Sequence, residues 1–251
     1  MTKPLETTSS LLGKTAEEIS DTTWLLGHDL KSPIAIVISA LEILISVHED
    51  DEELAHSVNL MRGALIAANR QYNMVSDLLD LARLETGDYE LQRYDTDIAA
   101  LIRASMENEI AAIKSKQLKL EIDIPRDANL MANIDSELFR RVVVALVDNT
   151  IKFTVRDDTF RVSVRRVGAN IEVLFSDNGR GIFPDFEAHL ADRGPQWDSR
   201  QAGSRTSVGM GLPFVHAVLK AHGGTFTGKT DADTRFTTFT LQIPALSAQA
   251  G

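Results

Sequence analysis

A short apolar strand runs directly into a glycine-rich turn at residues 170–182, NIEVLFSDNGRGI. β-Branched and aromatic residues in 170–176 predict the strand. Glycines at 179 and 181 let the backbone turn tightly and approach a ligand closely. The acid before them, Asp177, can accept a hydrogen bond from an amine of that ligand. Taken alone, the motif also fits an ordinary turn.

A second glycine cluster, GMGL at 209–212, opens a predicted helix. A helix that begins between Gly209 and Gly211 presents free backbone N–H groups and the positive end of its dipole, which suit a phosphate. Residues 183–208 show little periodicity, and long loops of this kind in compact domains are often functional lids. Each cluster alone fits a turn, but the two together favour a ligand site.

The elements around these clusters mix helices with antiparallel hairpins. Helical patterns occupy 98–116, 135–153 and 211–222, and strand patterns occupy 118–124, 160–167, 170–176, 224–229 and 236–243. This order predicts an α+β sandwich over roughly residues 92–246.

The predicted helix 135–153 ends in the motif DNTIKF. Asn149 can offer an amide oxygen to a hard cation such as Mg²⁺. Lys152 is three residues further on, near the same helix face, and can pair with a phosphate. The simpler alternative is a solvated helix end, where a lysine is favourable in any case.

Apolar residues recur with helical spacing in the first third of the chain. They fall three or four residues apart over 26–44 and, in an unbroken seam, over 54–82. A charged break at 48–53 separates the two runs. We therefore expect a helical hairpin over 15–88.

Three further features of this hairpin can be predicted from the sequence. The polar segment 1–14 is predicted to be disordered, Pro33 to kink the first helix, and Gly87 to end the second. One apolar seam per helix makes a thin hairpin, which buries much more surface when a second hairpin docks on it. We expect a homodimer in which the four helices form a bundle. Packing of the hairpin on the rest of the chain is the alternative.

The first predicted helix carries the motif HDLKSP. His28 lies between the seam residues Leu26 and Leu30, so its side chain should point away from the seam. A neutral imidazole is a good nucleophile near pH 7, and the neighbouring carboxylate of Asp29 can orient or deprotonate it. Ser32 is one turn further on, on the same face as His28. Taken alone, a surface histidine is the simpler interpretation.

Composition excludes several other kinds of chemistry. The 251 residues are 43% hydrophobic, contain no cysteine and carry a formal net charge of −10. Disulfides, thiolate metal sites and a cysteine nucleophile are therefore excluded. The acidic balance argues against broad binding to nucleic acid or to an anionic membrane. The longest nearly uncharged run, 33–47, is expected to be too short and too polar to cross a bilayer, so we expect a cytoplasmic protein.

Together and in this order, the motifs resemble the catalytic core of a two-component sensor histidine kinase. HDLKSP is similar to the phospho-acceptor box of that family, LVDNTIKFT to its ATP-binding N box, DNGRGI to its first glycine box and GMGLPF to its second. LLDLARLETG resembles the end of the second dimerisation helix of that family, and HGG at 222–224 also matches its sequence pattern. The resemblance implies a dimerisation and histidine phosphotransfer domain over 15–88, followed by a GHKL-type ATP-binding domain over 92–246.

The resemblance implies roles for the matching residues of the hairpin. His28 would take the γ-phosphoryl group of ATP on a ring nitrogen, and Asp29 would take or hold the imidazole proton. Ser32 stands where the family often positions water for dephosphorylation.

The resemblance also implies how the second domain would bind ATP and Mg²⁺. Asn149 would bind Mg²⁺, Lys152 would contact phosphate, and Asp177 would accept a hydrogen bond from the adenine amine. The lid would be 183–208, with Arg200 and Arg205 as candidate cations for the γ-phosphate. The full set implied to hold the nucleotide is Asn149, Lys152, Phe153, Asp177, Gly179, Gly181, Ile182, Gly209, Gly211 and Leu212.

The implied function is autophosphorylation of His28, followed by transfer of the phosphoryl group to an aspartate of a response regulator receiver domain, with phosphatase activity as an addition. The input would come from a separate sensor protein, unless the chain is a fragment of a longer sensor. Ala145 stands where the family usually has a second asparagine, four residues before Asn149. This departure favours the alternative of a degenerate kinase that acts as a phosphotransfer or docking scaffold. A further alternative is another ATPase of the same nucleotide-binding fold. Such ATPases lack a histidine-bearing hairpin before the ATP domain, so HDLKSP and the seam at 54–82 argue against it.

Overall fold

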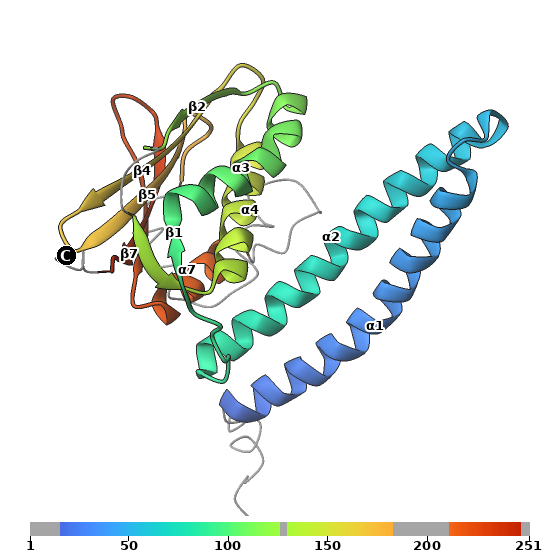
Figure 1. Cartoon of the computed structure of the whole chain (residues 1–251), viewed down its shortest axis with the longest axis horizontal. Coiled ribbons are helices and arrows are strands. Elements are labelled where there is room, and N and C mark those ends of the chain that lie inside the picture. Colours follow the sequence, from blue (N-terminus) through green and yellow to red (C-terminus); the bar gives the residue numbers. More distant parts are fainter. Residues whose placement is uncertain (1–15, 126–129, 183–210, 247–251) are drawn as a thin grey trace, which may run out of the picture. The chain divides into compact units, whose positions relative to one another are not determined.

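The computed structural model describes residues 16–125, 130–182 and 211–246, without the side chains of 16–29, 52 and 70. Contacts within the chain divide it between Tyr89 and Glu90. The first unit is helical and the second combines helices with strands (Figure 1).

The first unit is the predicted helical hairpin. Helix α1 spans Ala16–His48 and helix α2 spans Ala55–Thr86, joined through a short 3-10 turn, η1, at Glu52–Leu54. The Asp51 carboxylate accepts hydrogen bonds from the backbone N–H groups of Glu53 and Leu54 and so shapes the turn. Gly87 ends α2 as predicted, in the left-handed conformation with φ 82°, and its N–H donates to the Arg83 carbonyl.

The apolar seam of α1 divides into two parts. Ile45 is buried, and Ile34, Ile38 and Leu41 are half-buried. Ile34 and Leu41 belong to the predicted seam, whereas Ile38 and Ile45 were not predicted for it. The predicted seam residues Leu30, Val37 and Leu44 are 53%, 50% and 42% exposed. Within the described hairpin, the second helix therefore covers only part of the apolar arc of α1.

The second unit is built on a mixed five-stranded sheet in the order β2-β4-β5-β7-β6. Strand β2 is parallel to β4, and the other neighbours are antiparallel. The strands are β2 Lys119–Asp123, β4 Thr159–Val167, β5 Asn170–Asp177, β6 Thr225–Thr230 and β7 Thr237–Pro244.

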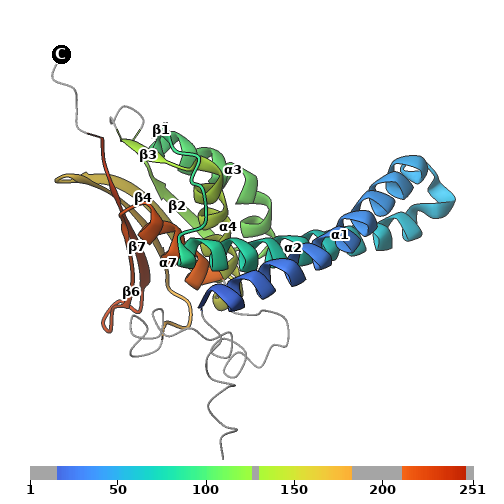
Figure 2. The same cartoon turned by 90° about the horizontal axis from the view of Figure 1, so that it is seen from below.

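Three helices lie on one face of this sheet: α3 Ile98–Ser115, α4 Ser136–Phe153 and α7 Gly211–Ala221 (Figure 2). Alternate residues of the strands point toward them, because successive side chains of a strand leave opposite faces. The core joins Phe160, Phe175 and Phe239 of the sheet to Phe139 of α4 and Phe214 of α7, all at most 1% exposed. This packing holds the ends of α4 and β5, where the glycine-rich turn begins.

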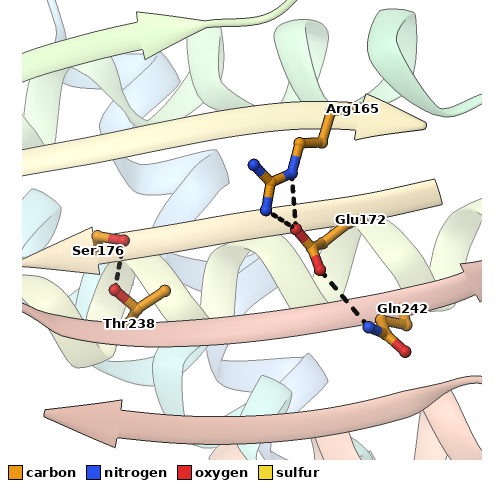
Figure 3. A network of polar contacts seen from close by, with 5 residues as sticks. All are labelled: Arg165, Glu172, Ser176, Thr238 and Gln242. Atoms are coloured by element: carbon orange, nitrogen blue, oxygen red, sulfur yellow. Dashed lines mark hydrogen bonds and ion pairs between the residues drawn. The ribbon is translucent and has the colours of Figure 1, made fainter. Parts of the chain in front are cut away.

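The opposite face of the sheet is polar. Cross-strand hydrogen bonds connect its three central strands: Arg165 Nε donates to Glu172 Oε1 at 2.7 Å, and the Ser176 and Thr238 hydroxyls lie 2.9 Å apart (Figure 3). The Gln242 amide reaches the other carboxylate oxygen of Glu172 at 3.5 Å. Cross-strand pairs of this kind contribute about 0.2–1 kcal/mol each. They stabilise the central strand, β5, on the face that the helices do not cover.

A second, two-stranded sheet was not predicted. Strand β1, Tyr94–Asp97, pairs antiparallel with β3, Met131–Ile134. Each strand has four residues, and the first reads YDTD, so neither shows the apolar alternation that marks a strand in a sequence. The other elements of this unit were predicted within one or two residues, and the predicted α+β class is confirmed.

One stretch of the described chain, Leu30–His48 in α1, is long and apolar enough to cross a membrane by length and composition alone. The expectation that no segment could span a bilayer is therefore not supported on this criterion. The stretch is longer than the predicted 33–47, because it extends by several residues at its start and one at its end.

Candidate functional site

Asp177 is the last residue of β5, a strand flanked on both sides, and its side chain points to the helix-covered face. It pairs in register with Phe160 of β4 and Thr237 of β7 and is 4% exposed. Its Oδ1 accepts the Gly179 N–H at 3.0 Å, and its Oδ2 accepts the Thr150 hydroxyl at 3.4 Å. Because a carboxylate oxygen has two lone pairs, each oxygen keeps capacity for a ligand.

Burial is the main influence on the ionisation of this carboxyl. It raises the pKa of Asp177 above the ordinary value, and the Asp158 charge acts in the same direction. The hydrogen bonds from Gly179 and Thr150 act in the opposite direction, because they stabilise the ionised form. The two donors therefore help to keep a hydrogen-bond acceptor in an apolar setting.

The turn after Asp177 packs against the end of α4. The Arg180 N–H donates to the Phe153 carbonyl at 3.2 Å. A Cβ at Gly179 would lie 2.5 Å from that carbonyl oxygen, closer than real Cβ atoms come. We predicted that Gly179 allows close approach of a ligand; the structure gives it a packing reason, because a side chain there would meet the α4 backbone.

Gly181 is needed for its backbone conformation. Its φ of +85° lies in the left-handed region, which glycine adopts without strain. The next residue, Ile182, donates its N–H to the Thr230 hydroxyl at 3.0 Å, and Thr230 lies 3.0 Å from the Thr237 hydroxyl. The turn is therefore held by α4 on one side and by β6 and β7 on the other.

The last turns of α4 bring the predicted polar residues to the same place. Asn149, Lys152 and Phe153 are half-buried there. Lys152 Nζ lies 4.6 Å from the centre of the Phe153 ring, and the Arg180 guanidinium carbon lies 3.9 Å from it. Two cations thus gather at the helix end from which a phosphate contact was predicted.

Sequence reasoning missed Arg180 and Thr150 at this site. Arg180 stands between the two glycines of the turn, and a cation in that position was the available signal. Thr150 gave no signal of its own, because its approach to Asp177 depends on the packing of α4 against β5.

The second glycine box meets the same helix. A Cβ at Gly211, the first residue of α7, would lie 3.6 Å from the Ala145 side chain, one turn of α4 before Asn149. Leu212 follows, half-buried. Ala145, which stands where the resembled family usually has a second asparagine, therefore lies against the start of α7. Gly209 and the predicted lid, 183–208 with Arg200 and Arg205, lie outside the described residues.

The predicted phospho-acceptor residues belong to the helical unit. His28 and Asp29 lie within α1, but their side chains are outside the described part of the chain. Ser32 is exposed. Lys31, beside it, places its Nζ 4.9 Å from the centre of the Tyr72 ring of α2. The roles predicted for all these residues remain predictions.

His222, the first residue of HGG, has a structural environment. Its Nδ1 donates to the Val218 carbonyl at 2.7 Å, and its Nε2 accepts the Asp135 N–H at 3.0 Å. Burial lowers the pKa of His222, which favours the neutral ring that both contacts require. Asp135 caps α4 by accepting the N–H groups of Glu137 and Leu138. The ring thus connects the end of α7 with the start of α4.

The residues present fit a magnesium ion that is held mainly by phosphates. Within the described residues, no three His, Cys, Asp or Glu side chains gather as a metal site. Asn149 offers one amide oxygen at the end of α4. Mg²⁺ often binds through one or two protein oxygens plus substrate phosphates and water, so a single asparagine is compatible with it.

Comparisons with known proteins agree with this organisation. Residues 134–247 match the family model described as histidine kinase-, DNA gyrase B-, and HSP90-like ATPase. The sensor-like histidine kinase SenX3 of Mycobacterium tuberculosis is 29% identical over 221 residues, which cover 88% of this chain and 52% of that protein. The adaptive-response sensory kinase SasA of a Synechococcus strain is 28% identical over 80% of this chain and 52% of its own length. The chain thus spans about half the length of these curated relatives.

Solved structures show the same fold. The histidine kinase AdeS of Acinetobacter baumannii aligns over 88% of this chain and 98% of its own, with a TM-score of 0.55 and 23% identity. Full-length ShkA, solved in complex with AMPPNP, aligns over 92% of this chain and 47% of its own, with a TM-score of 0.70 and 19% identity.

Residues 134–247 of the second unit are thus similar to ATPase domains of the histidine kinase, DNA gyrase B and HSP90 type. With the helical hairpin before it, the chain is similar over most of its length to part of the sensor-like histidine kinase SenX3, and it shares its fold with the solved histidine kinase AdeS.

Proposed function

We propose that the chain is an ATP-dependent protein-histidine kinase that phosphorylates its own His28 and passes the phosphoryl group to an aspartate of a response regulator. The observation that carries the proposal is the buried carboxylate of Asp177, held by Gly179 and Thr150 at the end of α4. It lies in a domain of an ATPase family, and the motif HDLKSP precedes that domain on α1.

The nucleotide is held from both ends in this proposal. Asp177 accepts a hydrogen bond from the adenine amine, and the turn at Gly179–Ile182 forms the wall beside the base. Lys152 contacts phosphate, and Gly211 and Leu212 offer backbone N–H groups at the start of α7. Asn149 holds Mg²⁺, which when bound neutralises phosphate charge.

The transfer step needs no group beyond those named. A ring nitrogen of His28 attacks the γ-phosphorus, the bond to the β,γ-bridging oxygen breaks, and ADP leaves. Asp29 takes or holds the imidazole proton. The phosphoryl group then moves from nitrogen to the regulator aspartate, and Ser32 positions water for phosphatase activity. Catalysis is mostly positioning and charge neutralisation.

The proposed assembly is a cytoplasmic homodimer that receives its input from a sensor. The exposed stripe of Leu30, Val37 and Leu44 on α1 supports the dimer, because an apolar stripe at seven-residue spacing suits another helix. The names of the relatives, which include "sensor" and "sensory", support the input.

A second proposal is a degenerate kinase that serves as a phosphotransfer or docking scaffold. Ala145 supports it, because it removes a polar group from the helix turn that contacts Gly211. Loss of one polar contact near a bound metal costs on the order of 1–3 kcal/mol, or about tenfold to hundredfold in affinity.

The test is incubation of the purified chain with Mg²⁺ and γ-labelled ATP. A kinase incorporates label that survives base and is lost in acid, and His28→Ala abolishes it while His56→Ala, an exposed histidine of α2, retains it. Ser32→Ala should keep autophosphorylation and slow dephosphorylation of the regulator. Label that persists in His28→Ala contradicts the mechanism. No label on the parent chain, with charging of His28 by a phosphorylated regulator, favours the scaffold.

A further inference from the structure

We infer that Thr150 is the positioning residue for the base-binding carboxylate: its hydroxyl holds one oxygen of Asp177 so that the carboxylate accepts an adenine amine and disfavours a guanine carbonyl. This inference rests on the proposed ATP binding and deepens it. It gives a role to a buried hydroxyl that no sequence motif singled out.

The geometry isolates this pair from solvent. Thr150 is 1% exposed and Asp177 is 4% exposed. The hydroxyl lies 3.4 Å from Oδ2, while the Gly179 N–H lies 3.0 Å from Oδ1. One donor per oxygen sets the plane of the carboxylate, and each oxygen retains a lone pair for a ligand.

Thr150 is itself held in place by a second threonine. The carbonyl of Thr150 accepts both the N–H of Thr154 at 3.0 Å and its hydroxyl at 2.6 Å. These two bonds close the last turn of α4. The hydroxyl of Thr150 is therefore presented to Asp177 from a fixed helix end rather than from a loop.

The hydroxyl also affects which purine the carboxylate accepts. An ionised carboxylate accepts a hydrogen bond from the exocyclic amine of adenine, whereas the corresponding oxygen of guanine is itself an acceptor and would be repelled. A protonated carboxyl could donate to that oxygen. Because a donor to the carboxylate favours its ionised form, Thr150 supports adenine selectivity.

The charged groups described at this site come from three parts of the chain. Asp158, just before β4, raises the pKa of the Asp177 carboxyl together with burial, which is the larger cause. Lys152 of α4 and Arg180 of the turn lie on the Phe153 ring. A change at Thr150 leaves all three in place, so its effect on titration is separable from theirs.

The experiment compares Thr150→Val with Thr150→Ser in the full chain. Valine has the shape of threonine without the hydroxyl, so we expect AMPPNP binding, measured by calorimetry with Mg²⁺, to weaken about tenfold. The acidic limb of affinity against pH should move to higher pH, and the preference for ATP over GTP should fall. Serine should restore all three. Thr150→Ala replaces valine if the valine variant does not fold.

Thr154→Val is the matched control, because it removes a hydroxyl from the same helix end without touching Asp177 and keeps the Thr154 N–H bond to the Thr150 carbonyl that closes the last turn of α4. It should lower the unfolding temperature and leave the pH midpoint of nucleotide binding unchanged. A separate readout needs no nucleotide: the Asp177 carboxyl resonance, followed by carbon NMR, should titrate at higher pH in Thr150→Val than in the parent chain.

The outcomes separate this inference from the proposed function. If the parent chain binds AMPPNP and Thr150→Val matches it in affinity, pH midpoint and Asp177 titration, the positioning role is wrong and the kinase proposal stands. If the parent chain does not bind AMPPNP at all, ATP binding and this role fail together.

Discussion

The carboxyl of Asp177 is buried at the end of β5, and that burial raises its pKa above the ordinary value of 3.8. A folded-state pKa above the unfolded value means that folding favours the protonated form. The resulting stability is fully present below the unfolded pKa and is lost as the pH rises through the folded pKa. At neutral pH the ionised carboxylate therefore opposes folding. The same carboxylate is an acceptor that a nucleotide base can use.

Asp177→Asn should separate the two effects. We expect the unfolding temperature of the variant to exceed that of the parent chain by a margin that grows as the pH rises from 4 to 8. The reason is that only the parent chain acquires a buried charge over this range. Its affinity for ATP should fall about tenfold to a hundredfold, since a hydrogen bond to a charged group is lost. Thermal unfolding at several pH values and calorimetric titration with ATP measure the two.

Asp231→Asn is the control at this scale. The backbone N–H of Thr234 is the main cause that lowers the pKa of this exposed aspartate, so its stability contribution is present above the unfolded pKa and lost in acid. The Asp231→Asn variant should therefore show no gain in unfolding temperature over the parent chain at neutral pH. A loss of stability in Asp177→Asn that grows toward pH 8 would contradict the role given to burial.

At the scale of elements, helix α1 presents more apolar surface than α2 covers. Leu30, Val37 and Leu44 repeat every seven residues and are about half exposed. Residues at this spacing lie on one face of a helix and suit a coiled-coil partner. Within the described hairpin, α2 therefore covers one side of α1 and leaves this stripe exposed.

Val37→Glu tests the proposed dimer. A glutamate in the middle of the stripe would place a charge in the interface, so we expect a shift from dimer to monomer at micromolar concentration. Analytical ultracentrifugation measures the shift. Ser39→Glu, which adds the same charge at an exposed polar position of α1, should leave the dimer intact. A parent chain that is monomeric, or a Val37→Glu dimer as tight as the parent, would show that the stripe is not the interface.

The elements differ in how far they could be predicted. Helices α3 and α4 were predicted within one or two residues, because many core contacts repeat along each helix and leave a long periodic signal. Strands β1 and β3 were missed, because four residues carry too little alternation and their pairing joins segments far apart in sequence. The division of the α1 seam was also missed, because periodicity shows that a residue is apolar on one face but not which neighbour covers it.

At the scale of the whole molecule, the two units should unfold separately. We expect calorimetry to show two transitions. The midpoint of the hairpin should rise with protein concentration, because a dimer gains stability by mass action. The midpoint of the α+β unit should rise with ATP, because the bound nucleotide adds about 2.7 kcal/mol to the free energy of unfolding when the ATP concentration is a hundred times Kd. A single transition that responds to both, or a hairpin midpoint independent of concentration, would contradict this division.

The sequence by itself determined the elements with strong periodicity and the order of the motifs HDLKSP, DNTIKF, DNGRGI and GMGL. These are local properties, because strand alternation, helix spacing and turn chemistry depend on neighbours along the chain. Only the tertiary structure decided that Thr150 reaches Asp177, that the Phe153 carbonyl requires a glycine at 179, and that Ala145 lies against Gly211. Each of these contacts joins separate elements across a packed core, where fractions of an ångström decide which atoms meet.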